Sequence, residues 1–307
     1  MRERYEPSVL TAAITGGDVL PSQSAHLPCG AARIVEEAVA AADAGATCVH
    51  LHGREQDGRP SARAELLAEI AAGIRERCEV VLNFSTGGAP GMSEEQRLAA
   101  LSAARPEIAT LNVGTMNYEL FPTPGREPRV EHDWERAVLA GAGAGVFTNT
   151  LGSVRRFAAA FRELGITPEV EAYDMGHLAM ARFLLDEGTL QGPLRVQLVL
   201  GVFGGVGNAL EDLAAMAQAA QRILGGDLGA LGVAATGFPM EFRCAATGLS
   251  WGMDCRVGLE DNLRVTRRRE AESNAELVAV AVGLAELVGR PIASPDQLRA
   301  ELGPWRS

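Results

Sequence analysis

The sequence predicts an α/β protein that folds as a single (β/α)8 TIM barrel. Short apolar runs alternate with helical stretches eight times along 307 residues, a length normal for one barrel of this class. Hydrophobic residues make up 47% of the chain, enough to bury a large core. The alternative is an open doubly wound sheet, which requires a glycine fingerprint after its first strand. Gly16-Gly17-Asp18 is not G-x-G-x-x-G, so the barrel is favoured.

Each strand is predicted where a short apolar run meets turn residues. In chain order the eight strands are 9–15, 47–52, 80–84, 108–113, 169–174, 195–201, 231–236 and 255–259. Helices follow the strands, and two have clear end signals: Gly45 ends the first, and Ser93 with Gln96 forms a capping box that begins another. The other helices are expected at 62–77, 153–164, 176–186, 209–224, 239–247 and about 270–287.

One segment interrupts this rhythm. Residues 117–150 contain several prolines and a run of glycine and alanine, so they predict an irregular excursion that is partly helical around 134–139. A strand or an approach to the next helix is expected at 146–149. No internal repeat, linker or low-complexity tract is present, so residues 1–307 are expected to form one barrel domain that carries this excursion.

Charge and residue usage exclude several classes of function. The net charge of −11 argues against a nucleic-acid or anionic-membrane surface. The amino-terminus lacks an apolar signal core and no apolar run could span a bilayer, so a cytoplasmic protein is expected. Five widely spaced cysteines argue against a disulfide framework. All 28 basic residues are arginine, which excludes a lysine Schiff base and a Walker-type phosphate loop.

Polar side chains should converge where the barrel strands end. His50 and His52 are two residues apart on the predicted second strand and therefore share one face. Glu260 follows the eighth strand, and in a closed barrel strands two and eight both flank strand one. The three side chains can thus meet as the His₂Glu set of a catalytic zinc ion. The alternative is a pair of barrel-lining histidines satisfied by hydrogen bonds.

Two further groups could bind or transform a substrate. The segment 85–88 (Ser-Thr-Gly-Gly) offers hydroxyls and successive N–H groups that suit a carboxylate or oxyanion, although an ordinary strand-to-helix turn also uses these residues. Arg256 could orient Asp261, bind a substrate carboxylate bidentately, or form a structural ion pair. Glu169 and Glu171 share a strand face, and one of them enters the site if that face points inward.

The arginine run at 267–269 is expected to begin the last helix in solvent. Contact with an anionic tail such as the phosphates of coenzyme A is the alternative. His177 is expected at the surface or behind the site.

Seven segments in order resemble the β-keto acid cleavage enzymes, typified by 3-keto-5-aminohexanoate cleavage enzyme. They are ITGGD (14–18), VHLHGRE (49–55), NFSTGG (83–88), NVGTMN (112–117), PEVEAYD (168–174), VLGVFGG (199–205) and CRVGLEDN (255–262). The combination of HLH with RVGLEDN is the most specific. The resemblance implies a homotetrameric barrel that uses Zn²⁺ or another divalent metal. Its reaction converts a β-keto acid and acetyl-CoA into acetoacetate and a new acyl-CoA.

The resemblance also implies roles for individual residues. The metal would be held by His50, His52 and Glu260. Asp261 would be the base, Arg256 its positioning partner and Glu171 a second acid near the metal. The substrate would be bound by Ser85, Thr86, Gly87 and Gly88, with Thr110 or Asn112 lining the same pocket. Asp18 stands where the family usually has a glutamate, which in the amino-substrate member faces the ammonium group. Gly53 and Glu55 also depart from the family's usual valine and aspartate.

The chemistry of the residues agrees with this implication. Cleavage of a carbon–carbon bond beside a ketone requires stabilisation of an enolate, and without lysine a Lewis-acid metal is the available electron sink. A metal-dependent hydrolase of the amidohydrolase kind is the main alternative, but it would place His-x-His on the first strand. The other alternative is an inactive metal- or ligand-binding barrel, against which the candidate base Asp261 argues.

Overall fold

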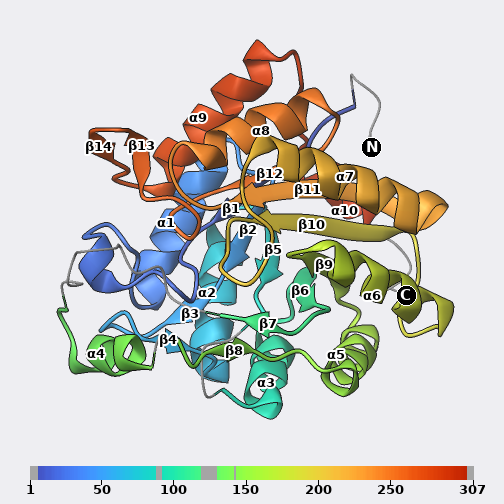
Figure 1. Ribbon diagram of the computed structural model, residues 1–307. Coiled ribbons are helices and arrows are strands. Elements are labelled where there is room, and N and C mark those ends of the chain that lie inside the picture. The colour runs from blue at the N-terminus through green and yellow to red at the C-terminus, as the bar shows by residue number, and fades with distance from the viewer. Residues whose placement is uncertain (1–5, 88–91, 119–129, 142, 303–307) are drawn as a thin grey trace.

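The computed structural model describes residues 6–87, 92–118, 130–141 and 143–302, and its centre is a closed barrel of eight parallel strands (Figure 1). The barrel strands are β1 (Leu10–Ala13), β2 (Cys48–Leu51), β5 (Val81–Phe84), β6 (Ile108–Asn112), β9 (Thr167–Ala172), β10 (Leu194–Leu200), β11 (Leu228–Ala235) and β12 (Asp254–Val257). The predicted (β/α)8 fold is confirmed, and each predicted strand matches one barrel strand.

The first strand closes the barrel between two strands that are far apart in the sequence. Thr11 of β1 pairs with Cys48 of β2 on one side and with Arg256 of β12 on the other. Parallel strands all end at the same rim of a barrel, so the residues after β2 and β12 lie on either side of the residues after β1. This topology brings a histidine pair near residue 50 to a carboxylate near residue 260.

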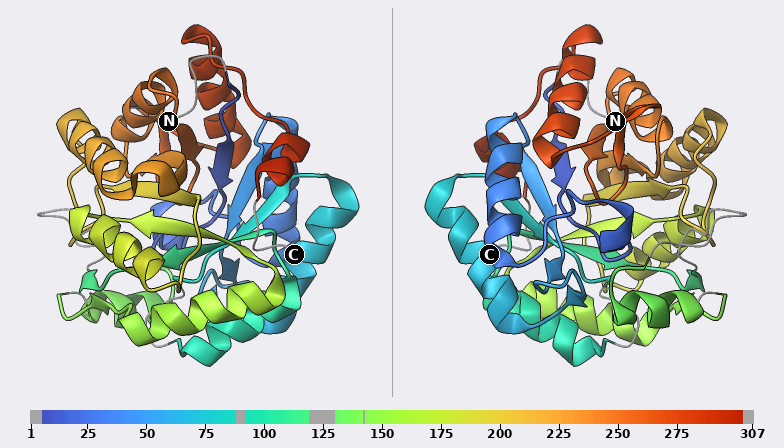
Figure 2. Two further views of the ribbon diagram at one scale, coloured as in Figure 1. Left: turned by 90° about the vertical axis from the view of Figure 1, so that its right-hand side faces the viewer. Right: turned by 90° about the vertical axis from the view of Figure 1, so that its left-hand side faces the viewer.

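Helices form an outer layer around the barrel (Figure 2). They are α1 (Ala31–Asp43), α2 (Ala64–Arg77), α3 (Glu94–Ala104), α5 (Leu151–Leu164), α6 (Met175–Asp186), α7 (Leu210–Leu224), α8 (Met240–Ser250) and α9 (Asn274–Leu287). The predicted capping box forms at α3, where Gln96 N donates to Ser93 Oγ over 3.2 Å and Ser93 N donates to Gln96 Oε1 over 2.8 Å. Within the described ranges, no helix is both long and apolar enough to cross a membrane.

Two predictions about local structure were wrong. The last long helix begins at Asn274, not near residue 270, and the arginine run lies in a hairpin of β13 (Arg264–Thr266) and β14 (Arg269–Glu270). The second barrel strand ends at Leu51, so His52 follows it.

The chain then forms another short hairpin, β3 (Gly53–Arg54) with β4 (Pro60–Ser61). Two single-turn 3₁₀ helices, η1 (Pro21–Gln23) and η2 (Gly225–Asp227), complete the connections.

The excursion contains the expected helix, α4 (Asp133–Ala140). The alternatives at 146–149 resolve as a strand, β8 (Val146–Phe147), which pairs antiparallel with β7 (Met116–Asn117). Residues 119–129 and 142, including the prolines of this segment, lie outside the described residues.

A short helix that the sequence did not predict, α10 (Pro295–Glu301), covers the amino-terminal end of the barrel. An apolar cluster separate from the main core forms there, and it consists of Val9, Cys48, Val81, Ile108, Ala293, Leu298 and Leu302. Ser8 also bridges to Ile292, next to this cluster. The amino-terminal end is therefore filled by side chains, and the opposite rim is left for a binding site.

Candidate active site

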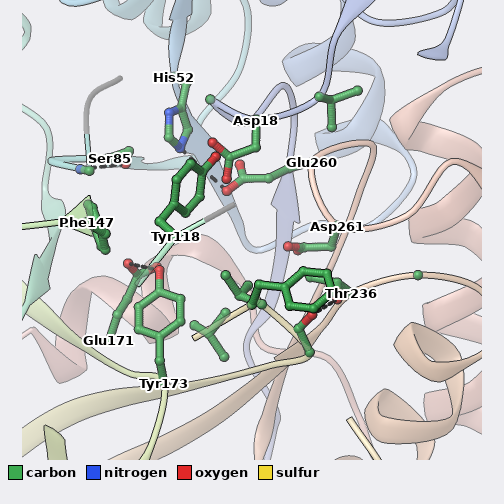
Figure 3. Close-up of a pocket in the computed structure, with 18 of the residues that line it drawn as sticks. Asp18, His52, Ser85, Tyr118, Phe147, Glu171, Tyr173, Thr236, Glu260 and Asp261 are labelled. Atoms are coloured by element: carbon green, nitrogen blue, oxygen red, sulfur yellow. Dashed lines mark hydrogen bonds and ion pairs between the residues drawn. The ribbon is translucent and has the colours of Figure 1, made fainter. Parts of the chain in front are cut away.

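The carboxyl-terminal rim of the barrel surrounds a pocket of about 880 Å³ (Figure 3). Most of the residues that the sequence singled out line it: Asp18, His50, His52, Ser85, Gly87, Asn112, Glu171, Arg256, Glu260 and Asp261. Apolar side chains from the excursion and from the loops after β10 and β11 line its outer part, among them Phe147, Phe203 and Phe238. The pocket is thus polar at its base and apolar toward its mouth.

The structure brings His50, His52 and Glu260 together. One oxygen of Glu260, Oε1, lies 3.6 Å from His50 Nε2 and 3.5 Å from His52 Nε2. The two imidazole rings meet edge to face with centroids 5.3 Å apart. One potential ligand atom from each residue lies within 4.8 Å of the others. This arrangement matches the separation that three ligands of one ion require.

The chemistry of these donors fits a divalent metal. Burial lowers the pKa of His50 to about 3 although Glu260 acts to raise it, so the ring is neutral and can donate a lone pair. Burial alone would raise the pKa of Glu260, but the guanidinium of Arg256 beside it holds that pKa well below its usual value. Across the described part of the chain, Glu260 Oε2 is buried without a hydrogen-bond partner. A buried anionic oxygen without a partner is costly, and a bound cation would satisfy it.

Arg256 connects the carboxylates of the site. Its Nε and Nη2 donate to the two oxygens of Asp261 over 2.8 Å each, which is the bidentate geometry. Nη2 also lies 2.7 Å from Glu260 Oε1, and Nη1 lies 3.4 Å from Glu171 Oε1. Burial raises the pKa of Asp261 while Arg256 opposes that rise. Arg256 therefore fixes the direction of the candidate base, as one of its predicted roles requires.

Glu171 is the acid of the fifth strand that enters the pocket. Burial raises its pKa to about 7, with Arg256 opposing and Glu260 and Glu169 adding to the rise. Tyr173 Oη donates to Glu171 Oε2 over 3.2 Å (Figure 3). Sequence reasoning missed Tyr173, although its position two residues beyond Glu171 at a strand end was a usable signal.

Glu169 points toward the same barrel interior but lies deeper, outside the pocket lining. It accepts a hydrogen bond of 2.7 Å from Asn83 Nδ2, and Arg195 lies 3.9 Å away. Asn83 is the register neighbour of His50 across β2 and β5. This polar layer supports the histidine pair from below. His177 lies behind the site, where its Nδ1 accepts a hydrogen bond from Tyr173 N over 3.2 Å.

The predicted carboxylate-binding residues divide into two groups. Ser85, Gly87 and Asn112 line the pocket, and both polar atoms of the Asn112 side chain are buried without a partner in the described segments. Thr86 and Thr110 instead bond to each other, because Thr86 Oγ1 donates to Thr110 O over 2.6 Å and Thr86 N donates to Thr110 Oγ1 over 3.2 Å. Both threonines lie outside the pocket lining, so contact with substrate stays a prediction for them. Gly88 lies outside the described residues.

Asp18 faces the pocket from the loop after β1 and bonds to Tyr118 (Figure 3). Burial raises the pKa of Asp18, while the hydrogen bond from Tyr118 opposes the rise. The loop that carries Asp18 is held from inside by Arg54, whose guanidinium donates to the carbonyls of Thr15, Gly16, Val19 and Gly58. Tyr118 could not be predicted, since the irregular excursion gives no periodic signal.

The loop after β12 is also anchored from outside the barrel. Glu241, buried at the start of α8, accepts hydrogen bonds of 2.9 Å from Gly258 N and from Asn262 Nδ2. Gly258 lies against the backbone of β1, and an added Cβ would sit 2.1 Å from Ala13 O. These contacts hold the segment 258–262, which contains Glu260 and Asp261, close to the end of β1.

A parallel barrel whose rim gathers two imidazoles, an arginine and several buried carboxylates defines a (β/α)8-barrel enzyme. Comparison with known proteins identifies which kind. The sequence profile of the beta-keto acid cleavage enzymes matches residues 7–303, so the chain belongs to the β-keto acid cleavage enzyme family. The family resemblance and the enzyme class predicted from the sequence are therefore confirmed.

Curated relatives agree over nearly the full length. A 3,5-dioxohexanoate:acetyl-CoA acetone transferase from Paraburkholderia graminis is 35% identical over 96% of this chain and 94% of its own. A 3-keto-5-aminohexanoate cleavage enzyme from Acetoanaerobium sticklandii is 33% identical over 97% and 98%. Among solved structures, the ternary complex of ObcA with a C4-CoA adduct and oxalate superposes with a TM-score of 0.69 at 21% identity. That match covers 92% of this chain and 68% of the other, and it supports the fold.

Proposed function

We propose that this enzyme cleaves a β-keto acid with acetyl-CoA, giving acetoacetate and a new acyl-CoA. The observation that carries the proposal is the bidentate pairing of Asp261 with Arg256 directly beside the His50, His52 and Glu260 cluster. A base aimed by a buried guanidinium, next to a site for a Lewis acid, suits removal of a proton beside a carbonyl group. Relatives named for acetyl-CoA-dependent reactions support the choice of co-substrate.

We propose that His50, His52 and Glu260 hold a divalent metal, with zinc as the expected ion. When bound there, such an ion supplies a positive charge that polarises a substrate carbonyl. The rest of the chemistry belongs to the side chains. Asp261 accepts the proton from the carbon between the keto and carboxyl groups, and Arg256 keeps that carboxylate directed at it. Glu171, with its pKa of about 7, can hold or release a proton on the opposite side of Arg256.

The substrate carboxylate is assigned to Ser85, Gly87 and Asn112. Gly87 N donates to Ser85 Oγ over 3.0 Å, and this bond holds the Ser85 hydroxyl in place at the wall of the pocket. The side-chain amide of Asn112, which has no hydrogen-bond partner among the described residues, would complete the set from the neighbouring strand. These groups would orient the β-keto acid so that its central carbon faces Asp261.

The acyl group of the β-keto acid is left open. Relatives of similar identity are named for different acids, among them 3-dehydrocarnitine and 3-oxoadipate.

We also propose that residues 1–307 act as one barrel domain, that the enzyme is a homotetramer, and that it works in the cytoplasm. Light scattering of the purified protein and cell fractionation test the last two points.

The reaction is tested by incubating metal-replete enzyme with acetyl-CoA and a panel of β-keto acids, and by following acetoacetate with mass spectrometry. We expect acetoacetate and a matching acyl-CoA from at least one acid, only when both substrates are present. The alternative, a hydrolase, would consume its substrate without acetyl-CoA. Absence of acetoacetate across a panel that spans cationic, anionic and apolar acyl groups would contradict the proposal.

A further inference from the structure

The hairpin β13–β14 carries four arginines, and the described residues provide acidic partners for two of them. Arg264 lies 3.6 Å from Glu270, and Arg269 forms an ion pair with Glu276 at the start of α9. Arg267 and Arg268 lie exposed at the turn, and neither guanidinium meets a carboxylate in the described ranges. Glu270 of the hairpin and Glu276 of α9 are thus already paired, and among the described residues no carboxylate pairs with the two arginines of the hairpin tip.

The positive charge of the hairpin tip contrasts with the acidic character of the rest of the protein. The chain has a net charge of −11, so a basic tip is not a consequence of general composition. Adjacent like charges repel each other and favour an anionic ligand that can neutralise both. Arginine is also the side chain best suited to phosphate, because its planar donors match two phosphate oxygens at once.

The hairpin directly continues the loop that forms the active site. Glu260 and Asp261 are followed by Leu263 and Arg264, which line the pocket mouth. From Glu260 to Arg267 the chain advances seven residues, so their backbones are at most about 25 Å apart. Figure 1 shows the hairpin projecting from the barrel beside α9. The hairpin tip at Arg267 is thus only three residues beyond Arg264, which lines the pocket.

The pocket mouth suits the arm of such a ligand. Phe203, which is 54% exposed, and Phe238 line the outer pocket together with Leu263. The other arginines of the lining have inward partners: Arg256 holds the carboxylates, and Arg97 donates to Thr86 O. Arg264 is thus the pocket-lining arginine on the hairpin, and it connects the mouth to the basic tip.

We propose that the β13–β14 hairpin binds the phosphates of the coenzyme A moiety, with Arg267 and Arg268 as the main contacts and Arg264 on the pocket side. This inference rests on the proposed use of acetyl-CoA. The thioester must reach the base of the pocket, so the pantetheine arm crosses the apolar mouth and the diphosphate and 3′-phosphate emerge at the rim. The arginine run is then a determinant of co-substrate binding without a role in the chemical step.

The test compares acetyl-CoA with S-acetylpantetheine, which keeps the thioester and lacks the nucleotide phosphates. For R267A/R268A we expect KM for acetyl-CoA to rise by about fivefold to tenfold, the range expected for exposed charge contacts, with kcat unchanged. KM for S-acetylpantetheine should stay at the wild-type value. The conservative R267K/R268K variant should recover most of the acetyl-CoA affinity, and added salt should shrink the difference between wild type and R267A/R268A.

Arg222→Ala, which removes an exposed arginine from the outer helix α7, is the matched control and should change neither KM. The inference is overturned if R267A/R268A binds acetyl-CoA as wild type does. It is also overturned if KM rises equally for both thioesters, because that result would mean a general disturbance of the pocket. Failure of the proposed function would look different, since wild-type enzyme would then turn over neither thioester.

Discussion

At the scale of single residues, the site separates groups that would hold a metal from the group that would move a proton. His50 reaches Glu260 through Nε2, whereas Asp261 is engaged at both oxygens by Arg256. Both Glu260 and Asp261 contact Arg256, and Glu260 in addition lies 3.6 Å from His50 and 3.5 Å from His52. This division predicts different outcomes for substitutions that lie only a few ångströms apart.

His50→Ala should lose the metal and, with it, turnover, because one of three ligands is removed. Asp261→Asn should keep about one metal ion per chain and lose turnover by about 10²-fold to 10⁴-fold, the usual contribution of a general base. Elemental analysis of the two purified variants, together with steady-state kinetics, checks this. Equal loss of metal in both variants would reject the assignment of separate roles.

Glu171 gives the metal-free protein a specific pH dependence of stability. Burial raises its pKa in the folded state to about 7, above the ordinary value of 4.5 for a glutamate, so the folded protein holds this proton more tightly than the unfolded chain does. The free energy of unfolding therefore falls as pH rises from 4.5 through about 7. Glu171→Gln cannot titrate, so its stability relative to wild type should increase by roughly 3 kcal/mol across this window.

Urea unfolding of both proteins at pH 4.5 and pH 8, with chelator present, measures this change. Glu211→Gln, at an exposed position on α7, is the control for removal of a surface charge. A stability difference between Glu171→Gln and wild type that is the same at both pH values would show that Glu171 does not titrate as described.

The sequence located the residues whose position follows from strand periodicity. His50 and His52 share a face because side chains alternate along a strand, and the same rule put Glu169 and Glu171 on one face without deciding whether that face points inward. The threonines were beyond this reasoning, since periodicity gives the face of a residue and not its hydrogen-bond partner. Thr86 and Thr110 satisfy each other across two strands, and only the packed barrel shows that.

At the scale of elements, the loop after β12 depends on one close backbone approach. Gly258 has a φ of +153°, and a Cβ at this position would lie 2.1 Å from Ala13 O. Gly258→Ala should push the loop away from β1 and lower the free energy of unfolding by about 2–4 kcal/mol. Metal affinity should fall as well, because Glu260 is only two residues further on.

The matched control is Gly283→Ala on α9, where an added Cβ has nothing within 4 Å. That change should be neutral or stabilising by up to about 1 kcal/mol, because alanine is the better helix former. Urea unfolding and isothermal titration with zinc compare the two variants. Equal behaviour of both would mean that the contact between Gly258 and Ala13 does not hold the loop.

Element prediction succeeded for the barrel strands because each is a continuous apolar run bounded by turns. It failed for the β13–β14 hairpin, whose strands of three and two residues are too short to show a period. It also missed α10, a helix of seven residues. Helices and strands this short are decided by tertiary contacts, and α10 is held by the apolar cluster at the barrel end.

At the scale of the whole molecule, the apolar cluster around α10 and the candidate active site lie at opposite ends of the barrel. Leu298 of α10 is fully buried in the cluster at the amino-terminal end, far from the rim that carries the site. Leu298→Ala should lower the free energy of unfolding by about 2–5 kcal/mol, as expected for a leucine removed from a core. Its kcat at a temperature where the variant is folded should equal that of wild type.

Leu287→Ala, at a leucine that is 85% exposed, is the control and should change stability by less than about 0.5 kcal/mol. Chemical unfolding and turnover measured on the same preparations distinguish the two effects. A folded Leu298→Ala protein with impaired kcat would show that the two ends of the barrel are coupled.

The position of β1 between β2 and β12 has a consequence for biosynthesis. In a growing chain both histidines leave the ribosome before five further barrel strands, and β12 and the carboxylate of Glu260 follow only after those strands. Until then the sheet keeps two open edges, which chaperones or neighbouring nascent chains can engage. The proposed metal site cannot be completed before that stage, so loading of the ion is expected to follow translation of nearly the entire barrel.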